Sequence, residues 1–225
     1  MTSPSPAPPP GSPPGPPQPD RDCPLCPRLV AYRMANRAAF PDWHNAPVPS
    51  WGPRDSRILV LGMAPGLRGA NRTGRPFTGD HAGKLLYATL LRHGLAQGQY
   101  EERPDDGLTL TGCRVVNAVR CVPPANLPEP AEVRTCNGFL AGELAAMPAL
   151  RVVLALGVLA HNALLRSFRI PAARMPFGHG RLHDLPNGLQ VADSYHVSRY
   201  NTSTRRLTPE MFEAVMQEVV ARAVA

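Results

Sequence analysis

The amino-acid sequence predicts an α/β fold, a three-layer α/β/α sandwich around a central, mainly parallel sheet of four strands. Four short apolar runs have the composition of strands buried on both faces, at 57–62, 114–118, 151–156 and 189–194. Helical segments separate these runs, as the crossover connections of a parallel sheet require. A chain of 225 residues is long enough for one such domain and an appendage.

The appendage is residues 1–20, which hold ten of the 28 prolines, no aromatic residue and no basic residue. Such a segment buries too little apolar surface to fold, so we expect it to be disordered and 21–225 to form the domain. Proline at position 209 suits the first turn of a terminal helix, with Thr208 as its N-cap. The other helices are expected over 28–40, 82–93, 130–147 and 157–167.

A loop rich in glycine follows the first strand and occupies residues 62–83. Its six glycines allow the backbone to approach a ligand closely, and ligands collect beyond the carboxyl ends of parallel strands. Phe77 and Asp80 lie within it, which a loop that only connects two elements would not require. The sequence therefore predicts a binding site in this loop.

The formal net charge is +7, and the only charge within residues 1–20 is Asp20, so the predicted domain carries an excess of positive charge. Such an excess indicates a polyanionic partner. No segment approaches the length of a membrane span, and no apolar signal region follows Met1. We therefore expect a cytoplasmic protein without a membrane partner.

Four of the five cysteines have the spacing of metal ligands. Cys23 and Cys26 form a CxxC pair, and Cys121 and Cys136 flank a proline-rich run. In a reducing cytoplasm, clustered thiols are used for metals more often than for disulfides. The spacing fits four-thiolate ligation of zinc or of an iron–sulfur cluster and does not choose between them. Cys113, just before an apolar strand, is expected to be a small buried hydrophobic residue.

Three stretches carry a resemblance to a known family: GMAPGLRGANRTGRPFTGDHAG at 62–83, NAVRCVPPANLPEPAEVRTC at 117–136 and SYHVSRYNTSTRRLT at 194–208. Together they resemble the family 5 (type B) uracil-DNA glycosylases of bacteria and archaea. The resemblance implies a monomeric enzyme that removes uracil from bacterial DNA, with hypoxanthine and other deaminated bases as candidate further substrates. It also implies a 4Fe–4S cluster on the four cysteines. Val197 departs from the family pattern, which has proline there.

A glycosylase must extrude the damaged base into a pocket, where an aromatic ring stacks on it and an amide reads its edge. Phe77 is the candidate for stacking, and Asn117, at the end of the second strand, offers both a donor and an acceptor. Without the resemblance, Asn117 would be interpreted equally well as a turn residue. The pocket is expected to include Gly62, Met63 and Ala64.

Two residues are candidates for catalysis. His196 follows the last strand and, as either a neutral imidazole or a cation, could donate a hydrogen bond to uracil O2 as negative charge develops there. Related families carry a polar residue at the position that Ala64 occupies here. The methyl group of alanine cannot polarise water. We therefore assign to Asp80 the orientation of the attacking water and the stabilisation of positive charge on the sugar. The alternative for Asp80 is a helix N-cap, and both roles can coexist.

The segment after His196 is basic. Arg199, Arg205 and Arg206 are expected to contact DNA phosphates, and Tyr200 to wedge into the space left by the extruded base.

Two other interpretations are open. His179 and His183 are spaced like metal ligands, but without a visible third ligand we expect a partly exposed loop pair. The alternative function is a non-catalytic, zinc-containing nucleic-acid-binding module.

Overall fold

The computed structural model describes residues 18–224, and its centre is a five-stranded sheet in the order β4-β1-β5-β7-β6. Four strands are parallel and confirm the four predicted from the sequence. They are β1 (Ile58–Gly62), β4 (Cys113–Asn117), β5 (Val152–Leu156) and β7 (Gln190–Ser194).

The sequence analysis missed the fifth strand, so the prediction of a four-stranded sheet is corrected to five. β6 (Leu182–Asp184) pairs antiparallel with β7 at the edge of the sheet. It is short and only partly buried, so it lacks the apolar run that marks an interior strand. A separate two-stranded ribbon, β2 (Ala96–Gln97) with β3 (Thr109–Leu110), is too short to give a periodic signal.

The five long helices lie within two residues of their predicted bounds. Thr208 caps the last of them, because its Oγ1 accepts a hydrogen bond from the Met211 amide at 3.2 Å. The helices are α1 (Pro27–Ala39), α3 (His81–Arg92), α4 (Pro130–Ala145), α5 (Val158–Ser167) and α7 (Pro209–Val224). The remaining short elements were not expected: α2 (Ala70–Thr73), α6 (Arg199–Ser203), and the 3-10 turns η1 (Pro124–Asn126) and η2 (Ala172–Arg174).

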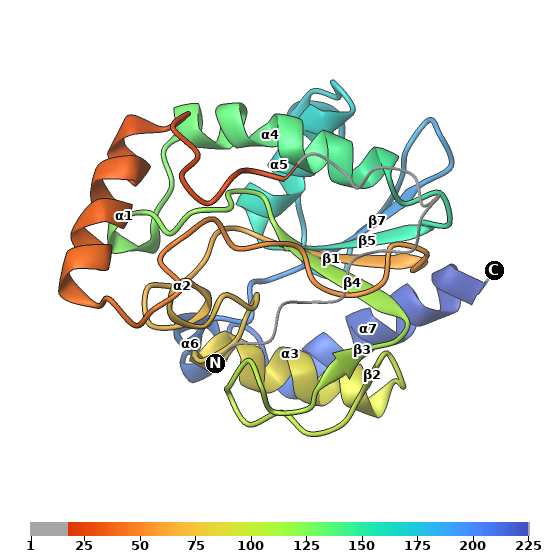
Figure 1. Cartoon of the computed structure of the whole chain (residues 1–225). Helices are drawn as coiled ribbons and strands as arrows, with labels where there is room; N and C mark the ends of the chain where they lie inside the picture. Colours follow the sequence, from red (N-terminus) through yellow and green to blue (C-terminus); the bar gives the residue numbers. More distant parts are fainter. Residues whose placement is uncertain (1–17, 225) are drawn as a thin grey trace, which may run out of the picture.

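The sheet separates two hydrophobic cores. Helices α4 and α5 cover one face and α3 and α7 the other, which confirms the three-layer arrangement (Figure 1). Along β1 the side chains alternate: Ile58 and Val60 pack toward α3 and α7, whereas Leu59 and Leu61 pack toward α4 and α5. All four are buried, and each contributes roughly 1.5–3 kcal/mol by leaving water. This double burial explains why the sequence marks these strands so clearly.

The predicted tail lies mostly outside the described residues, and its disorder stays a prediction. Gln18, the first described residue, donates a hydrogen bond to Glu143 at 2.8 Å. Within residues 18–224, none of the helices combines the length and the hydropathy that crossing a membrane would need.

Candidate active site

A cleft of about 800 Å³ opens where the four parallel strands end. The glycine-rich loop, the start of α5 and the segment 195–206 supply most of its lining, together with Asn117, Asn126 and Phe177. Its volume falls within the roughly 300–1,000 Å³ of small-molecule sites. Eight predicted site residues line it: Met63, Ala64, Phe77, Asp80, Asn117, His196, Arg199 and Arg206. The predicted residues Gly62, Tyr200 and Arg205 are not part of the lining.

Gly62 instead makes room for the residues that line the cleft. A Cβ at this position would lie 2.5 Å from the Phe77 ring and 2.4 Å from Asn117 Oδ1. Phe77 itself has a left-handed backbone, with φ of 51°, which costs on the order of 1–3 kcal/mol for a non-glycine residue. Its ring is 6.1 Å from the ring of His196, with 30° between their planes. The strained backbone thus holds an aromatic ring at the carboxyl-terminal edge of the parallel strands.

Asn117, the last residue of β4, has an unpaired polar atom. The residue is 3% exposed, and its Oδ1 finds no hydrogen-bond partner within the described part of the chain. A buried acceptor without a partner costs about 1–3 kcal/mol. Because Asn117 lines the cleft, a ligand with an N–H group can supply the missing partner.

Asp80 is the N-cap of α3, which confirms the structural role that the sequence analysis gave as its alternative. Its Oδ1 accepts a hydrogen bond from the Ala82 amide at 3.1 Å. Burial raises the pKa of Asp80, and the amides of Ala82 and Gly83 oppose this by favouring the ionised form. The other oxygen, Oδ2, lies against Gly66 and Gly69, where a Cβ would approach it to 2.8 and 2.1 Å. Two glycines of the loop are therefore required for this carboxylate to reach the cleft.

His196 is held neutral at physiological pH. Burial lowers the pKa of its imidazole to about 4. A neutral imidazole has one N–H donor, so His196 can donate a hydrogen bond without carrying a charge. Of the two forms considered from the sequence, neutral or cationic, the structure favours the neutral one.

The loop after β7 is ordered without the proline of the family pattern. Val197 is fully buried in the core next to α7. Ser198 caps α6, with its Oγ accepting from the Asn201 amide at 3.3 Å. Asn201 Nδ2 in turn donates to the carbonyl of His196 at 2.8 Å. Burial and these hydrogen bonds fix the loop where proline would have restricted φ.

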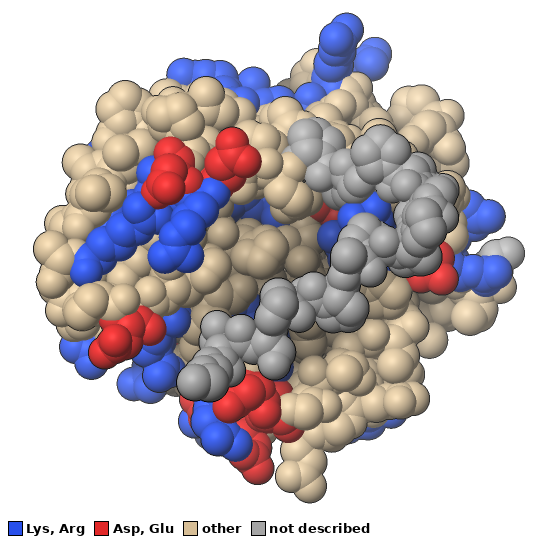
Figure 2. Space-filling model, in the orientation of Figure 1, with Lys and Arg blue, Asp and Glu red and all other residues tan. Residues whose placement is uncertain are grey.

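Basic side chains surround the cleft, although charge on the face shown in Figure 2 is mixed, with acidic side chains beside basic ones. Arg199 and Arg206 are exposed and line the cleft, and the Arg206 guanidinium lies 4.6 Å from the centre of the Tyr195 ring. Tyr200 is 70% exposed. The sequence analysis missed Arg68 at this rim, although it is a basic residue of the same glycine-rich loop. It also missed Tyr195 and Phe177, whose positions only the fold reveals.

The four candidate cysteine ligands line one small cavity between α1, α4 and the chain after β4. Burial and the charges of Cys136 and Cys23 raise the pKa of Cys26 to about 11, so these thiols are close neighbours. The Arg120 amide donates to Cys136 Sγ at 3.4 Å. Cys113 lies apart in the core beneath α3, as expected. The structure thus brings together the cysteines that the spacing grouped.

The two spaced histidines do not form a pair. His179 stacks on Tyr195 at 4.8 Å, whereas His183 lies in β6 and meets Asp193, which also binds His161. The expectation of a histidine pair was wrong, because strand pairing brings in partners distant in sequence. Both ring nitrogens of His161 face acceptors, Asp193 Oδ1 and the carbonyl of Met175, each at 2.7 Å.

His161 is therefore interpreted as one half of a buried ion pair. Burial alone would lower the pKa of His161, but Asp193 and the Met175 carbonyl together raise it. The ion pair ties α5 to β7 beside the cleft.

Residues 49–220 match the model of the Uracil DNA glycosylase superfamily. The chain is 48% identical over 202 residues to the Type-5 uracil-DNA glycosylase of Thermus thermophilus, which covers 87% of this chain and 91% of that protein. It is 41% identical to the Type-5 uracil-DNA glycosylase of Mycobacterium bovis, covering 87% and 76%. The corresponding protein of Pyrobaculum aerophilum is 38% identical, covering 90% and 89%. The chain therefore belongs to the uracil DNA glycosylase superfamily and, within it, to the type-5 uracil-DNA glycosylases.

Proposed function

We propose that this chain is a DNA repair glycosylase that extrudes uracil from DNA and hydrolyses its N-glycosidic bond, with hypoxanthine and other deaminated bases as further substrates. The observation that carries the proposal is the convergence of three groups in one cleft: the Phe77 ring, the unpaired Asn117 oxygen and the Asp80 carboxylate. The family of the chain and the names of its relatives support the same activity.

Recognition of the base rests on Phe77 and Asn117. The Phe77 ring supplies a stacking surface for the extruded base. Asn117 Oδ1 accepts the N–H on the Watson–Crick edge of uracil, which pairs the buried oxygen that lacks a partner within residues 18–224. Met63 and Ala64 complete this wall of the pocket. Since a site built around a hydrogen bond rejects ligands that cannot make it, Asn117 gives selectivity as well as affinity.

Bond cleavage leaves negative charge on the base and positive charge on the sugar. His196, neutral by burial, donates its ring N–H toward O2 of the departing base, where the negative charge gathers. Asp80, held by the amides at the start of α3, faces the sugar as an ionised carboxylate and orients the attacking water. The two groups thus act on opposite charges of one transition state.

Contact with DNA is assigned to the segment after β7. Arg199, Arg205 and Arg206 bind phosphates, and the exposed Tyr200 fills the gap in the stack. Binding should weaken as salt increases, because each phosphate contact releases a counterion.

We further propose that Cys23, Cys26, Cys121 and Cys136 hold a 4Fe–4S cluster. The fit is supported by two buried guanidinium atoms that face no acceptor in the described chain: Nε of Arg33 and Nε of Arg120, both from residues that line the same cavity. Thiolates around a cluster would supply acceptors for these two Nε atoms, and Arg33 already reaches one of the thiols, with its Nη1 3.8 Å from Cys121 Sγ. The cluster would join the segment before α1 to α4 and stabilise both.

The sulfur spacing also favours a cluster over zinc. Thiolates on one zinc ion lie about 3.8 Å apart, given Zn–S bonds of about 2.3 Å. Within residues 18–224, no three of these four sulfurs lie within 4.8 Å of one another. Four cysteines that each bound a different iron of a 4Fe–4S cluster would not need to approach one another so closely.

The test of the proposed function is an incision assay on duplexes that carry uracil, hypoxanthine or thymine opposite guanine. Excision of uracil, with an undamaged duplex left intact, is the expected result. Absence of excision by a protein that binds DNA would favour the alternative, a zinc-containing binding module. Colour distinguishes the two independently, because an iron–sulfur protein is yellow-brown and a zinc protein is colourless.

We expect the excision rate to fall as the pH decreases, because protonation of Asp80 removes the charge that stabilises the sugar. Burial raises the pKa of Asp80, so the fall begins at a higher pH than for an exposed aspartate. His196 should contribute less, since burial lowers the pKa of its imidazole to about 4. The measurement is the single-turnover rate against pH. A rate that stays constant as the pH is lowered from neutral toward the pKa of an ordinary aspartate would contradict the assignment of Asp80.

A further inference from the structure

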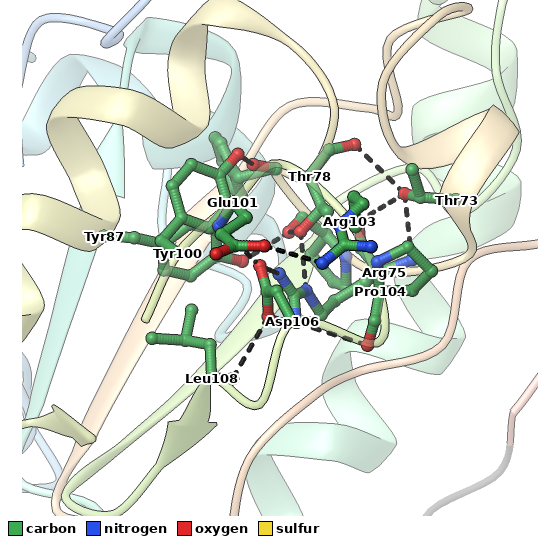
Figure 3. A network of polar contacts seen from close by, with 12 residues as sticks. Thr73, Arg75, Thr78, Tyr87, Tyr100, Glu101, Arg103, Pro104, Asp106 and Leu108 are labelled. Atoms are coloured by element: carbon green, nitrogen blue, oxygen red, sulfur yellow. Dashed lines mark hydrogen bonds and ion pairs between the residues drawn. The ribbon is translucent and has the colours of Figure 1, made fainter. Parts of the chain in front are cut away.

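The backbone of the loop that carries Phe77 is held by side-chain hydroxyl groups. Four consecutive backbone carbonyls, those of residues 75–78, lie within hydrogen-bond distance of side-chain hydroxyls (Figure 3). Thr73 Oγ1 lies 3.3 Å from the carbonyl of Arg75 and 3.0 Å from that of Thr78. The Pro76 carbonyl meets two hydroxyls, those of Thr78 (3.1 Å) and Tyr87. The Phe77 carbonyl accepts from the Tyr100 hydroxyl at 3.1 Å.

A buried ion pair organises these hydroxyls. The Arg75 guanidinium binds both carboxylate oxygens of Asp106 at 2.8 Å and donates from Nε to Thr78 Oγ1 at 2.7 Å. Asp106 also accepts the amides of Glu101 (2.9 Å) and Leu108 (3.1 Å), which closes the loop that follows Tyr100. A bidentate pair whose partners are all satisfied is rigid.

Tyr100 connects this pair to Phe77. Its ring lies 4.7 Å from that of Tyr87 and 5.9 Å from the Arg75 guanidinium. Gly83 leaves the space for its hydroxyl, since a Cβ there would lie 2.1 Å from the Tyr100 oxygen and 2.0 Å from the Phe77 carbonyl. Tyr100 is not among the residues that line the cleft, and its hydroxyl donates its hydrogen bond to the Phe77 carbonyl, so we expect it to affect the reaction through the Phe77 backbone.

We infer that Tyr100, fixed by the Arg75–Asp106 pair, is a positioning residue that sets the angle of the Phe77 ring toward the extruded base. Phe77 has a positive φ that an aromatic residue adopts only where its surroundings enforce it. The hydroxyl of Tyr100 fixes the peptide on one side of Phe77, and those of Tyr87 and Thr78 fix the other. Without the Tyr100 hydroxyl, this peptide can rotate and the ring tilts out of the stacking plane. The inference rests on the proposed function, because the base is the object that the ring meets.

The first test is Tyr100→Phe, which removes one hydroxyl and keeps the buried ring. The single-turnover excision rate for uracil at saturating protein should fall about ten-fold, less than the hundred-fold loss that a 1 Å misplacement can cause. DNA affinity should not change, since phosphate contacts lie elsewhere. Tyr32→Phe is the matched control: it removes a phenol hydroxyl from α1 that lines no part of the cleft, and it should excise at the parent rate.

The second test is a double-mutant cycle with Phe77→Leu, which separates positioning from general stability. If Tyr100 acts through the Phe77 ring, Tyr100→Phe should have no further effect on the rate of Phe77→Leu. An equal ten-fold loss in both backgrounds would overturn the inference, as would a Tyr100→Phe rate equal to the parent's. A parent protein that excises no uracil would overturn the proposed function itself, and this inference with it.

Discussion

Replacement of Asp80 by asparagine should slow single-turnover excision of uracil by about two orders of magnitude or more, the loss typical of removing one transition-state stabiliser. The departing base leaves a sugar with oxocarbenium character, and a fixed negative charge nearby lowers that barrier directly. Ala64 has no polar group to share the task. Asparagine keeps the size of the side chain and remains a good N-cap for α3, so the helix should be preserved.

Two controls separate the charge from its surroundings. Asp42→Asn makes the same chemical change at an exposed turn and should leave the rate unchanged. DNA affinity of Asp80→Asn should equal that of the parent, because binding depends on arginines and phosphates. An excision rate for Asp80→Asn within a few-fold of the parent's would reduce Asp80 to a helix cap and transfer the catalysis to His196.

The parts of the fold that sequence could predict are those with local signals. The run Ile58–Leu61 is apolar on both faces, and burial on both faces is what a central parallel strand requires. β6 escaped prediction because its register depends on pairing with β7, and its own residues are half-exposed. The formation and register of such edge strands are determined by tertiary contacts, which a single sequence does not reveal.

The residues of the site can likewise be divided into those that the sequence could predict and those that it could not. Asn117 and His196 follow parallel strands, so chain order alone places them at one edge of the sheet. Arg75, Tyr100 and Asp106 could not be assigned a role, because their contacts join segments 23 to 31 residues apart through packing. The sequence thus predicts the groups that face the base better than those that hold them in place.

The cysteine cavity contributes to the stability of the fold and is separate from the catalytic cleft. Its residues come from α1 and the segment before it, from the chain after β4 and from α4, and none of them lines the cleft. The Arg28 guanidinium binds Glu132 at 2.8 Å, which adds a second link between α1 and α4. A cluster here would therefore act on the position of the loop 121–136, whose Asn126 reaches the cleft.

Replacement of Cys121 by alanine should remove the brown colour and lower the yield of soluble protein. Where a metal completes a fold, its binding free energy, about 10–16 kcal/mol in small zinc domains, contributes to folding, so losing one ligand should cost several kcal/mol of unfolding free energy. The measurements are iron content, absorbance and the midpoint of thermal unfolding.

Cys113→Ala is the matched control for this variant, because Cys113 is a buried cysteine in the core that lines no part of the cavity. It should keep the iron content of the parent and lose only the modest stability expected from a small core cavity. Parental iron content in Cys121→Ala would contradict ligation by this thiol. Excision should fall mainly with the amount of folded protein, because no cysteine lines the cleft, and a smaller loss per folded molecule is expected from displacement of Asn126. A loss per folded molecule as large as that of Asp80→Asn would instead indicate a catalytic cluster.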